Sequence, residues 1–460
     1  MIHKSLNDVA TMADGVLTDE SLLETYVDGV STDTRTITNG CLFIPLIGEN
    51  FDGHNFVNDA FEKGALCSFW QKDKPHDHIN GPLILVEDTH KAMINLARKY
   101  RESIDMKVIA ITGSNGKTTT KDIITSLLSE KYKVQKTIGN YNNNIGLPKT
   151  LFTFDEDCEV GVLELGMENF HEISELTSIA QPDIAIMTNI GDSHLNNLKT
   201  KENIARAKFE ILEGLKEDGV FIYNGDDEIL KKIVKEFKLP EKTYTFGVNP
   251  DNDYVIEPIK YDETGNTFNL NEHMISVPLL GEHQMYNGAC AVIVAKLFGL
   301  EYTDFAKGLA STNLELTGMR NELKVFSDFS ILNDSYKSNP QSLNAGLGVV
   351  YSMTDYSRKI AIIGDMMGLG DEEIQIHKNI GMSIDPEKID YILTIGNSAF
   401  YLFEKAKARF PENHVFHFNT KDEVVEKAKE LIIKDTLVFV KASRPMELET
   451  IVHALEDYKL

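Results

Sequence analysis

The sequence has 460 residues, of which 42% are hydrophobic, and its formal net charge is −25. One hydrophobic core cannot serve a chain of this length, so about three domains of ordinary size are expected. The acidic balance argues against nucleic acid as a partner, because that binding needs clustered Lys and Arg. No apolar stretch approaches the ~18 residues of a membrane-spanning helix, so we expect a globular protein without membrane insertion.

The cysteines bear on the cellular compartment. Cys41, Cys67, Cys158 and Cys290 are scattered, with no CxxC spacing, which indicates neither a zinc site nor a disulfide framework. Residues 1–8 lack the apolar core of a signal peptide. We therefore expect a cytoplasmic protein with reduced thiols. Separately, we expect the protein to be a monomer.

The first segment, residues 1–102, contains short β-type runs at 41–47 and 83–86 and helical patterns at 56–63 and 90–101. Thr34 and Arg35 offer a hydroxyl and a guanidinium that could hold a phosphate, although Arg35 could instead pair with Asp33. We predict a smaller α/β domain here.

The most informative segment is residues 107–121, where an apolar run is followed by Gly113-Ser114-Asn115-Gly116. The pattern predicts a buried strand, a tight loop and a helix from about Thr118. Such a loop presents backbone N–H groups and a helix N-terminus to a polyphosphate. Lys117 would reach the β- and γ-phosphates, and the Thr118 hydroxyl would bind Mg²⁺. The general P-loop has a glycine where Ile111 stands, so a plain glycine-rich turn is the alternative.

The rest of the central segment, to residue 317, alternates between apolar runs and helical patterns. Strands are predicted at 161–165, 184–189 and 219–223, helices at 201–215 and 283–298, and a β-rich insertion at 250–280. Strands that alternate with helices indicate a parallel sheet covered on both faces, which is the α/β fold class.

Three side chains of this segment are candidates for chemistry. Glu164 ends a strand beside the glycine loop, where its carboxylate could bind Mg²⁺ or simply be solvated. His194 follows the strand at 184–189, although an isolated histidine is usually a satisfied core or surface side chain. Lys208 lies inside a predicted helix and is by default a solvated lysine.

The third segment, residues 318–460, has strands predicted at 331–333, 359–363, 391–395, 415–418 and 436–440, and a helix at 421–433. The loops that follow four of these strands carry Asp334, Asp365, Gly396-Asn397 and Lys441-Ala442-Ser443-Arg444. Ligands of open α/β sheets bind beyond the carboxyl ends of the strands, so this clustering is typical of a binding domain.

Several blocks must be considered together. They are Thr-Gly-Ser-Asn-Gly-Lys-Thr-Thr (112–119), Gly-Asn-Tyr-Asn-Asn-Asn-Ile-Gly-Leu-Pro (139–148), Thr-Asn-Ile-Gly-Asp-Ser-His (188–194), Asn-Asp-Ser-Tyr (333–336), Asn-Pro (339–340) and Gly-Asp-Met (364–366), with Thr-Asp-Thr-Arg (32–35), Leu-Phe-Ile-Pro (42–45) and Gly-Glu-Asn-Phe-Asp-Gly-His (48–54) near the N-terminus. Over essentially the whole chain, and in this order, they resemble the Mur ligases of peptidoglycan synthesis. The shortened glycine loop is also the form that this family uses.

The resemblance implies a fold and an activity. It implies a UDP-sugar-binding domain at 1–102, a central P-loop ATPase-type domain at 103–317 and a C-terminal Rossmann-like domain at 318–460. The N-terminal block is most similar to the members that use ATP to join D-alanyl-D-alanine to UDP-muramyl-tripeptide. An acyl phosphate is their intermediate, and ADP, phosphate and UDP-muramyl-pentapeptide are their products.

The resemblance also implies roles for single residues. ATP would be bound by Gly113, Ser114, Asn115, Gly116, Lys117, Thr118, Thr119, Asn287, Arg320 and Asp334. The muramyl peptide and the dipeptide would be bound by Thr34, Arg35, Asn142, Asn143, Asn339, Lys441 and Ser443. Two Mg²⁺ ions would be held by Thr118, Glu164, His194 and a carbamylated Lys208, and with Lys117 the last three form the implied catalytic set.

Some positions depart from the family pattern, and alternatives remain open. Lys337 stands where the family usually has asparagine, Pro445 where it has glycine, and Gly368 where glutamate is common, which leaves the dipeptide contacts undecided. A sister ligase that adds the third stem-peptide residue, or a folylpolyglutamate synthase, is one alternative. A nucleotide-binding scaffold without turnover is another. The third stem-peptide residue, L-lysine or diaminopimelate, is not determined by the sequence.

Overall fold

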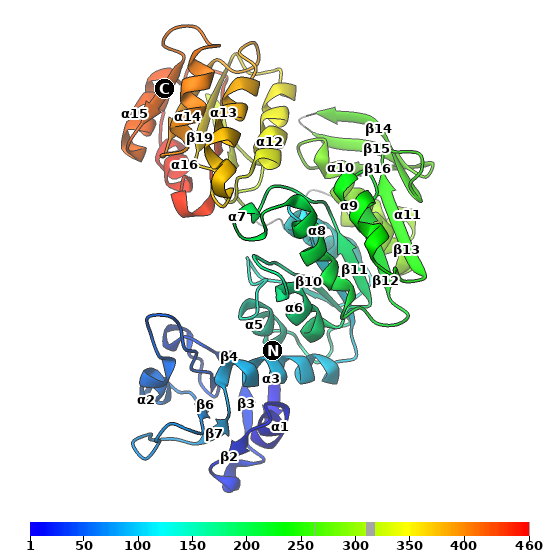
Figure 1. The fold of residues 1–460 in the computed structure, drawn as a ribbon, viewed down its shortest axis with the longest axis vertical. Helices are drawn as coiled ribbons and strands as arrows, with labels where there is room; N and C mark the ends of the chain where they lie inside the picture. The colour runs from blue at the N-terminus through cyan, green and yellow to red at the C-terminus, as the bar shows by residue number, and fades with distance from the viewer. Residues whose placement is uncertain (263, 310–317, 460) are drawn as a thin grey trace.

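The computed structural model describes residues 1–262, 264–309 and 318–459. The molecule is elongated, and three α/β units follow one another along its long axis in chain order (Figure 1). Each unit has its own sheet, and these sheets lie within the three predicted segments. The predicted boundary at residue 317 lies outside the described residues. In the described part of the chain, no helix is both long and apolar enough to cross a membrane.

The N-terminal unit is built on a small sheet with the strand order β2-β7-β6-β5-β4. These strands are β2 (Val16–Leu17), β4 (Val30–Ser31), β5 (Leu42–Phe43), β6 (Cys67–Gln71) and β7 (Leu83–Val86), while β1 (His3–Ser5) and β3 (Tyr26–Asp28) form a separate pair. The helices are α1 (Leu6–Met12), α2 (Val57–Glu62) and α3 (Thr89–Ser103). The strand predicted at 41–47 is therefore much shorter, because the chain turns after Phe43 toward the loop that precedes α2.

Helix α3 joins the N-terminal unit to the central one (Figure 1). Its buried side chains, among them Leu96 and Tyr100, belong to a hydrophobic core that contains residues of both units. The Tyr100 hydroxyl donates to the carbonyl of Phe154 at 2.7 Å, and Arg101 Nε donates to the carbonyl of Ala180 at 2.8 Å. The two units are thus held together by one continuous apolar core.

The central unit contains a nine-stranded sheet with the order β16-β15-β14-β13-β12-β11-β8-β10-β9. Its parallel part consists of β8 (Lys107–Thr112), β9 (Val134–Lys136), β10 (Val160–Glu164), β11 (Ile184–Met187), β12 (Val220–Asn224), β13 (Lys242–Gly247) and the start of β14 (Tyr254–Asp262). Antiparallel β15 (Gly265–Leu270) and β16 (His273–Val277) complete it and confirm the predicted β-rich insertion. The central strands are apolar throughout because helices cover both faces.

The helices of this unit are α4 (Lys117–Leu128), α5 (Gly146–Phe152), α6 (Glu172–Ala180), α7 (Leu195–Leu198), α8 (Lys201–Phe209), α9 (Glu228–Ile233), α10 (His283–Leu297) and α11 (Tyr302–Gly308). The helix predicted at 201–215 is too long, since α8 ends at Phe209 and passes into a 3-10 turn, Glu210–Leu212. Helix α5 was not predicted. The Asn143 side chain accepts the backbone N–H groups of Ile145 and Gly146 at 3.2 and 2.8 Å, in the turn that precedes this helix inside the asparagine-rich block.

The C-terminal unit has a six-stranded sheet with the order β17-β18-β22-β19-β20-β21, parallel except for β17. The strands are β17 (Glu322–Val325), β18 (Phe329–Asp334), β19 (Arg358–Gly364), β20 (Tyr391–Ile395), β21 (Val415–Phe418) and β22 (Thr436–Lys441). The helices are α12 (Pro340–Ser352), α13 (Glu373–Ser383), α14 (Ala399–Lys407), α15 (Lys421–Leu431) and α16 (Glu449–Glu456). The predicted strands are confirmed within one or two residues, and the predicted α/β alternation with them.

Candidate active site

The glycine loop joins the end of β8 to the start of α4 and has the predicted strand–loop–helix form. Gly113 and Gly116 have φ angles of 148° and 83°, which side-chain-bearing residues rarely adopt. A Cβ atom would lie 1.9 Å from Thr188 Oγ1 at Gly113 and 2.5 Å from Asn287 Oδ1 at Gly116. Glycine is therefore required at both positions by backbone conformation and by space.

Hydrogen bonds from neighbouring loops fix the shape of this turn. The backbone N–H groups of Ser114 and Asn115 donate to the carbonyl and the side-chain oxygen of Asn189, at 2.9 and 3.0 Å. Helix α4 then begins at Lys117 without a side-chain cap, so the N–H groups of its first turn remain to bind an anion. The Lys117 ammonium folds back and donates to the carbonyl of Gly113 at 2.7 Å.

Oxygen donors gather beside the loop at the end of β10. Thr118 Oγ1 donates to Glu164 Oε2 at 2.8 Å, and Asn142 Nδ2 donates to Glu164 Oε1 at 2.9 Å. Burial would raise the pKa of the Glu164 carboxyl, but the charges of Lys117 and Arg320 outweigh it and lower that pKa. An ionised carboxylate next to a hydroxyl suits a hard cation such as Mg²⁺.

His194 and Lys208 lie on the same side of the sheet as Glu164. Burial, together with the charges of Lys337 and Lys208, lowers the pKa of His194 to about 2, so its imidazole is neutral and can offer a lone pair. The Lys208 side chain is 1% exposed. Burial and the charges of Lys117 and Lys337 lower its pKa well below the ordinary value. The expectation of a solvated helix lysine is therefore wrong.

Basic side chains gather around Glu164. Lys117, Lys208, Lys337 and Arg320 lie close enough to Glu164 to affect its pKa or one another's. Among the residues that the structure describes, no group of three His, Cys, Asp or Glu side chains is arranged to hold a metal. A local group of cations at the start of a helix fits a site for polyphosphate.

The C-terminal unit reaches this loop through the start of α12. Asn339 Nδ2 donates to Asn115 Oδ1 at 2.8 Å and to Ser193 Oγ at 3.0 Å. Asn115 Nδ2 donates to Gln341 Oε1 at 3.0 Å, and Gln341 Nε2 donates to the carbonyl of Ile190 at 3.2 Å. Asn115 is thus the centre of a hydrogen-bonded contact between the two units.

Further residues of the C-terminal unit face the same space. The Arg320 guanidinium lies 4.3 Å from the ring centroid of Tyr336, and its Nε is buried without a hydrogen-bond partner among the described residues. Lys441 Nζ donates to Asp334 Oδ2 at 2.5 Å. Burial raises the pKa of Asp334 although Lys441 opposes the shift. A ligand in this space would meet groups from both units.

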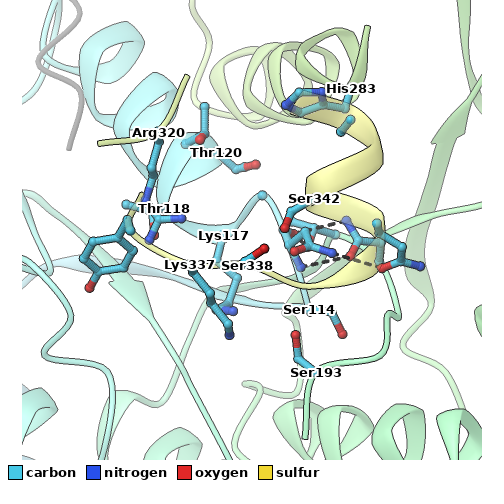
Figure 2. Close-up of a pocket in the computed structure, with 18 of the residues that line it drawn as sticks. Ser114, Lys117, Thr118, Thr120, Ser193, His283, Arg320, Lys337, Ser338 and Ser342 are labelled. Atoms are coloured by element: carbon cyan, nitrogen blue, oxygen red, sulfur yellow. Dashed lines mark hydrogen bonds between the residues drawn. The ribbon is translucent and has the colours of Figure 1, made fainter. Parts of the chain in front are cut away.

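These elements enclose a cavity of about 790 Å³ (Figure 2). The candidate residues that line it are Ser114, Asn115, Gly116, Lys117, Thr118, Thr119, Asn142, Glu164, His194, Asn287, Arg320, Asp334, Lys441 and Ser443. Gly113, Lys208 and Asn339 do not line the cavity; Gly113 and Asn339 support its lining through the contacts described above, and Lys208 is buried near it. The volume suits a nucleotide with part of a second substrate.

The remaining candidates lie elsewhere. Thr34, Arg35 and Asn143 do not line the cavity. Arg35 is largely exposed and pairs with Asp33 at 2.6 Å, and this contact lowers the pKa of Asp33 to about 2. The Asn143 side chain is bonded to the turn before α5, as described above. The residues expected to bind the muramyl peptide are therefore divided between the cavity and the surface of the N-terminal unit.

Several residues that line the cavity have no role predicted from the sequence, Lys337 and Gln341 among them. Lys337 is only a departure from the family pattern, and Gln341 follows the Asn-Pro pair at 339–340. Their positions depend on how α12 packs against the glycine loop, and no local pattern reports that contact. The additional charge of Lys337 in an otherwise matching block was the available signal.

Family models match nearly the whole chain. The Mur ligase family catalytic domain matches residues 26–101, the Mur ligase middle domain matches 111–295, and the glutamate ligase domain of Mur ligases matches 319–444. The UDP-N-acetylmuramoyl-tripeptide--D-alanyl-D-alanine ligase of Bacillus subtilis (strain 168) is 42% identical over 463 residues, which cover 100% of both chains.

Solved structures agree with the family models. MurF from Acinetobacter baumannii superposes with a TM-score of 0.89 at 27% identity, and 100% of both chains is covered. MurF ligase from Thermotoga maritima in complex with ADP gives a TM-score of 0.80 at 25% identity, and 94% of this chain and 97% of that one are covered. Over all three of its units, this chain belongs to the Mur ligase family.

Proposed function

We propose that this protein is an ATP-dependent ligase that joins D-alanyl-D-alanine to UDP-N-acetylmuramoyl-tripeptide and so completes the pentapeptide precursor of peptidoglycan. The observation that carries the proposal is the 42% identity, over the full length of both chains, with the Bacillus subtilis ligase of that name. The cavity between the central and C-terminal units supports it, since groups for a nucleotide and for a second substrate face one another there.

The reaction needs activation of a carboxylate. A carboxylate oxygen of the tripeptide attacks the γ-phosphorus of ATP, and the bond from that phosphorus to the β–γ bridging oxygen breaks, with its electron pair leaving on ADP. The amine of the dipeptide then attacks the acyl phosphate, and phosphate leaves from the tetrahedral intermediate. Two anions meet in the first step, so positive charge must be arranged around them.

The residues of the loop are suited to that task. The first-turn N–H groups of α4 and the Lys117 ammonium would hold the β- and γ-phosphates. To do so, Lys117 gives up its bond to the Gly113 carbonyl for one to a phosphate oxygen, which is the stronger because both groups are charged. Holding three substrates in line supplies a further part of the barrier reduction, up to ~7–11 kcal/mol.

The donor set beside the loop fits Mg²⁺. Thr118 and Glu164 would hold one ion together with phosphate oxygens, since both present oxygen at 2.8 Å from one another. A bound ion would neutralise charge on the γ-phosphate and polarise its oxygens. His194, Glu164 and Lys208 would hold a second ion.

Lys208 can serve a metal only after modification. An ammonium repels Mg²⁺, but the neutral amine reacts with CO₂ to give a carbamate, an anion with two oxygen donors. The complete burial of Lys208 among other cations favours the neutral amine that this reaction needs. The proposed carbamate forms with loss of a proton from the amine, and its negative charge would face the lysines around it.

The N-terminal unit, residues 1–102, is proposed to bind the UDP-sugar part of the substrate. Thr34, Arg35 and the loop at 50–54 would bind the diphosphate and sugar, and Asn142 and Asn143 would face the muramyl portion. The nearest helix of the central unit, α5, carries Lys149, whose charge acts on Asp33 beside Arg35. One cation from each unit, Arg35 and Lys149, therefore lies near Asp33 at the joint.

The test is release of phosphate from ATP by the full chain. We expect release only when both UDP-muramyl-tripeptide and D-alanyl-D-alanine are present, with the pentapeptide identified by mass. Release with UDP-muramyl-dipeptide and L-lysine or diaminopimelate would instead indicate a sister ligase, and release with folate and glutamate a folylpolyglutamate synthase. ATP binding without release in any mixture would indicate a scaffold.

A further inference from the structure

Lys337 lies on the segment that connects β18 to α12 and reaches the centre of the cavity. Figure 2 shows its side chain beside that of Lys117, which comes from the opposite unit. The backbone of the segment is fixed, because the Lys337 carbonyl accepts a hydrogen bond from Lys441 Nζ at 3.0 Å. The backbone N–H of Tyr336 donates to the carbonyl of Met319 at 3.3 Å. The fold therefore holds the Lys337 ammonium at a defined place opposite the glycine loop.

This ammonium has no carboxylate within ion-pair distance among the described residues, although thirty such contacts occur elsewhere in the chain. The charges that affect the Lys337 ammonium most are positive and repel it. Burial, then Lys117 and Arg320, lower the pKa of Lys337 to about 7, whereas Glu164 and Glu168 oppose the shift. Lys337 is half-buried, and a partly desolvated cation between other cations is costly unless an anion joins them.

The neighbouring groups are also donors without a partner. Ser338 is 3% exposed, and its hydroxyl has no hydrogen-bond partner among the described residues. It lines the same cavity and lies beside Lys337 in Figure 2. Helix α12, of 13 residues, begins at Pro340 beside this space; a capping box of Asn339 and Ser342 satisfies its first turn, so the helix contributes the positive end of its dipole rather than free N–H groups. A cation, a hydroxyl and a helix N-terminus thus face the start of α4 from the other side.

We propose that Lys337 is a catalytic residue that binds the terminal phosphate of the nucleotide from the C-terminal side, opposite Lys117. The proposal rests on the proposed function for the reaction but not for the binding of ATP. As the γ-phosphorus passes from the bridging oxygen of ADP to the carboxylate oxygen, Lys337 keeps its proton. Its charge offsets the negative charge on the phosphoryl oxygens.

The same position would allow a different role. A neutral Lys337 amine could take a proton from the dipeptide ammonium before the second step. The two roles differ in what they require of the nucleotide: a phosphate-binding cation distinguishes ATP from ADP, whereas a base for the dipeptide does not. The position of Lys337 opposite Lys117 and beside the unpartnered Ser338 hydroxyl favours the phosphate role. These three groups are all hydrogen-bond donors, and a phosphate offers them acceptor oxygens.

The experiment measures the dissociation constants of ADP and of β,γ-methylene-ATP, each with Mg²⁺, by calorimetry on the full chain. The variants are Lys337→Gln, which removes the charge, and Lys337→Arg, which retains it. Lys378→Gln is the control, since it removes a charge of the same unit whose ammonium lies 5.3 Å from the Tyr401 ring, away from the cavity. Thermal unfolding of each variant shows whether the fold is retained.

We expect Lys337→Gln to weaken the triphosphate analogue about tenfold or more while the affinity for ADP changes little. Lys337→Arg should recover most of the loss, and Lys378→Gln should match the wild-type protein. Equal weakening of both nucleotides, or no weakening of either, would overturn the proposal. In the second case, a shifted pH profile of phosphate release would identify the base. Because binding needs no muramyl substrate, this result is separate from failure of the proposed ligase reaction.

Discussion

The two junctions between the units of this protein are held by different kinds of contact. Helix α3 connects the N-terminal and central units through a shared apolar core that contains Leu96 and Tyr100. The contacts between the central and C-terminal units are more polar: Asn115 is bonded to Asn339 and Gln341, and a single described central side chain, Leu280, packs against the C-terminal core. The separation of an apolar interface exposes its whole area to water, whereas amide hydrogen bonds can be exchanged for bonds to water at small net cost.

The difference indicates which part of the molecule moves. The N-terminal and central units should behave as one body, and the C-terminal unit should open and close over the cavity. We propose that the hinge lies near residues 317–319, of which Thr317 lies outside the described residues. Next to it, Met319 and Asn321 have φ angles of 62° and 50° on either side of Arg320. Backbone strain of this kind is common where a chain presents a functional side chain.

The largest effect is expected on the central side of the mobile junction. Lys117→Ala should lower turnover by about a hundredfold to a thousandfold, because it removes the cation of the loop from the developing charge of the transition state. The free energy of unfolding should change little, since Lys117 contributes nothing to either core. Lys107→Ala, at the other end of β8, is the control. Near-normal phosphate release by a folded Lys117→Ala protein would disprove the nucleotide site.

Lys208 tests whether the buried cations of the site are used chemically. Lys208→Ala should lose most of its activity, and short carboxylates such as acetate should restore part of it by supplying the missing oxygen donor. Lys201→Ala on the same helix should remain active and should not respond to acetate. Mass analysis of the native protein for an added CO₂ on Lys208 gives an independent measurement. Full activity of Lys208→Ala without rescue would mean that the lysine is structural.

The apolar junction can be weakened without touching the cavity. Leu96→Ala should cost about 2–5 kcal/mol, because it leaves a cavity in the core shared by two units, and these two units should unfold together. Leu343→Ala, in the separate core of the C-terminal unit, should cost a similar amount but destabilise that unit alone. Denaturation followed by limited proteolysis distinguishes the two patterns. Independent unfolding of the N-terminal unit in Leu96→Ala would contradict the shared core.

Arg35 tests the division of labour along the chain. Its removal should raise the Michaelis constant for UDP-muramyl-tripeptide roughly tenfold, the value of one charge-assisted hydrogen bond to a phosphate. The constant for ATP should stay the same, because Arg35 is absent from the cavity lining. Arg98→Ala, in the same unit, serves as the control. An effect on ATP alone would place the uridine nucleotide elsewhere.

The smallest effect is expected at the amide contact itself. Gln341→Ala removes two hydrogen bonds between the units, so it should shift the molecule toward open forms with little change in stability. X-ray scattering with β,γ-methylene-ATP and muramyl peptide should show compaction of the wild-type protein and less compaction of the variant. Gly191→Ala displaces the same side chain, since its Cβ would lie 1.9 Å from Gln341 Oε1, and should act in the same direction. A wild-type radius of gyration that both ligands leave unchanged would argue against closure.

Local sequence patterns predicted the order of the three units and part of the regular structure. The parallel strands of the C-terminal sheet and four central strands, β8, β10, β11 and β12, were found because buried parallel strands are continuous apolar runs, and α4 because glycines precede a helical pattern. Other elements were not predicted, among them the buried strand β6 and the helix α6. The helix predicted to reach residue 215 ends at Phe209, and the Glu210 side chain that follows accepts the N–H groups of His171 and Ser174 at 2.8 and 3.2 Å. Contacts of this kind join residues far apart in the sequence, so no local pattern reports them.

What the sequence determined by itself is the chemistry that depends on adjacent residues: the glycine loop, the Lys117–Thr118 pair and the blocks typical of Mur ligases. What the tertiary structure decided is which distant residues share a space. Lys208 resembles any helix lysine until packing buries it, and Lys337 becomes a candidate for phosphate binding only when the segment before α12 lies against the loop. Burial and charge proximity act through space rather than along the chain. The family resemblance had pointed to Lys208, but the physical reason for its reactivity, like the position of Lys337, is given only by the folded protein.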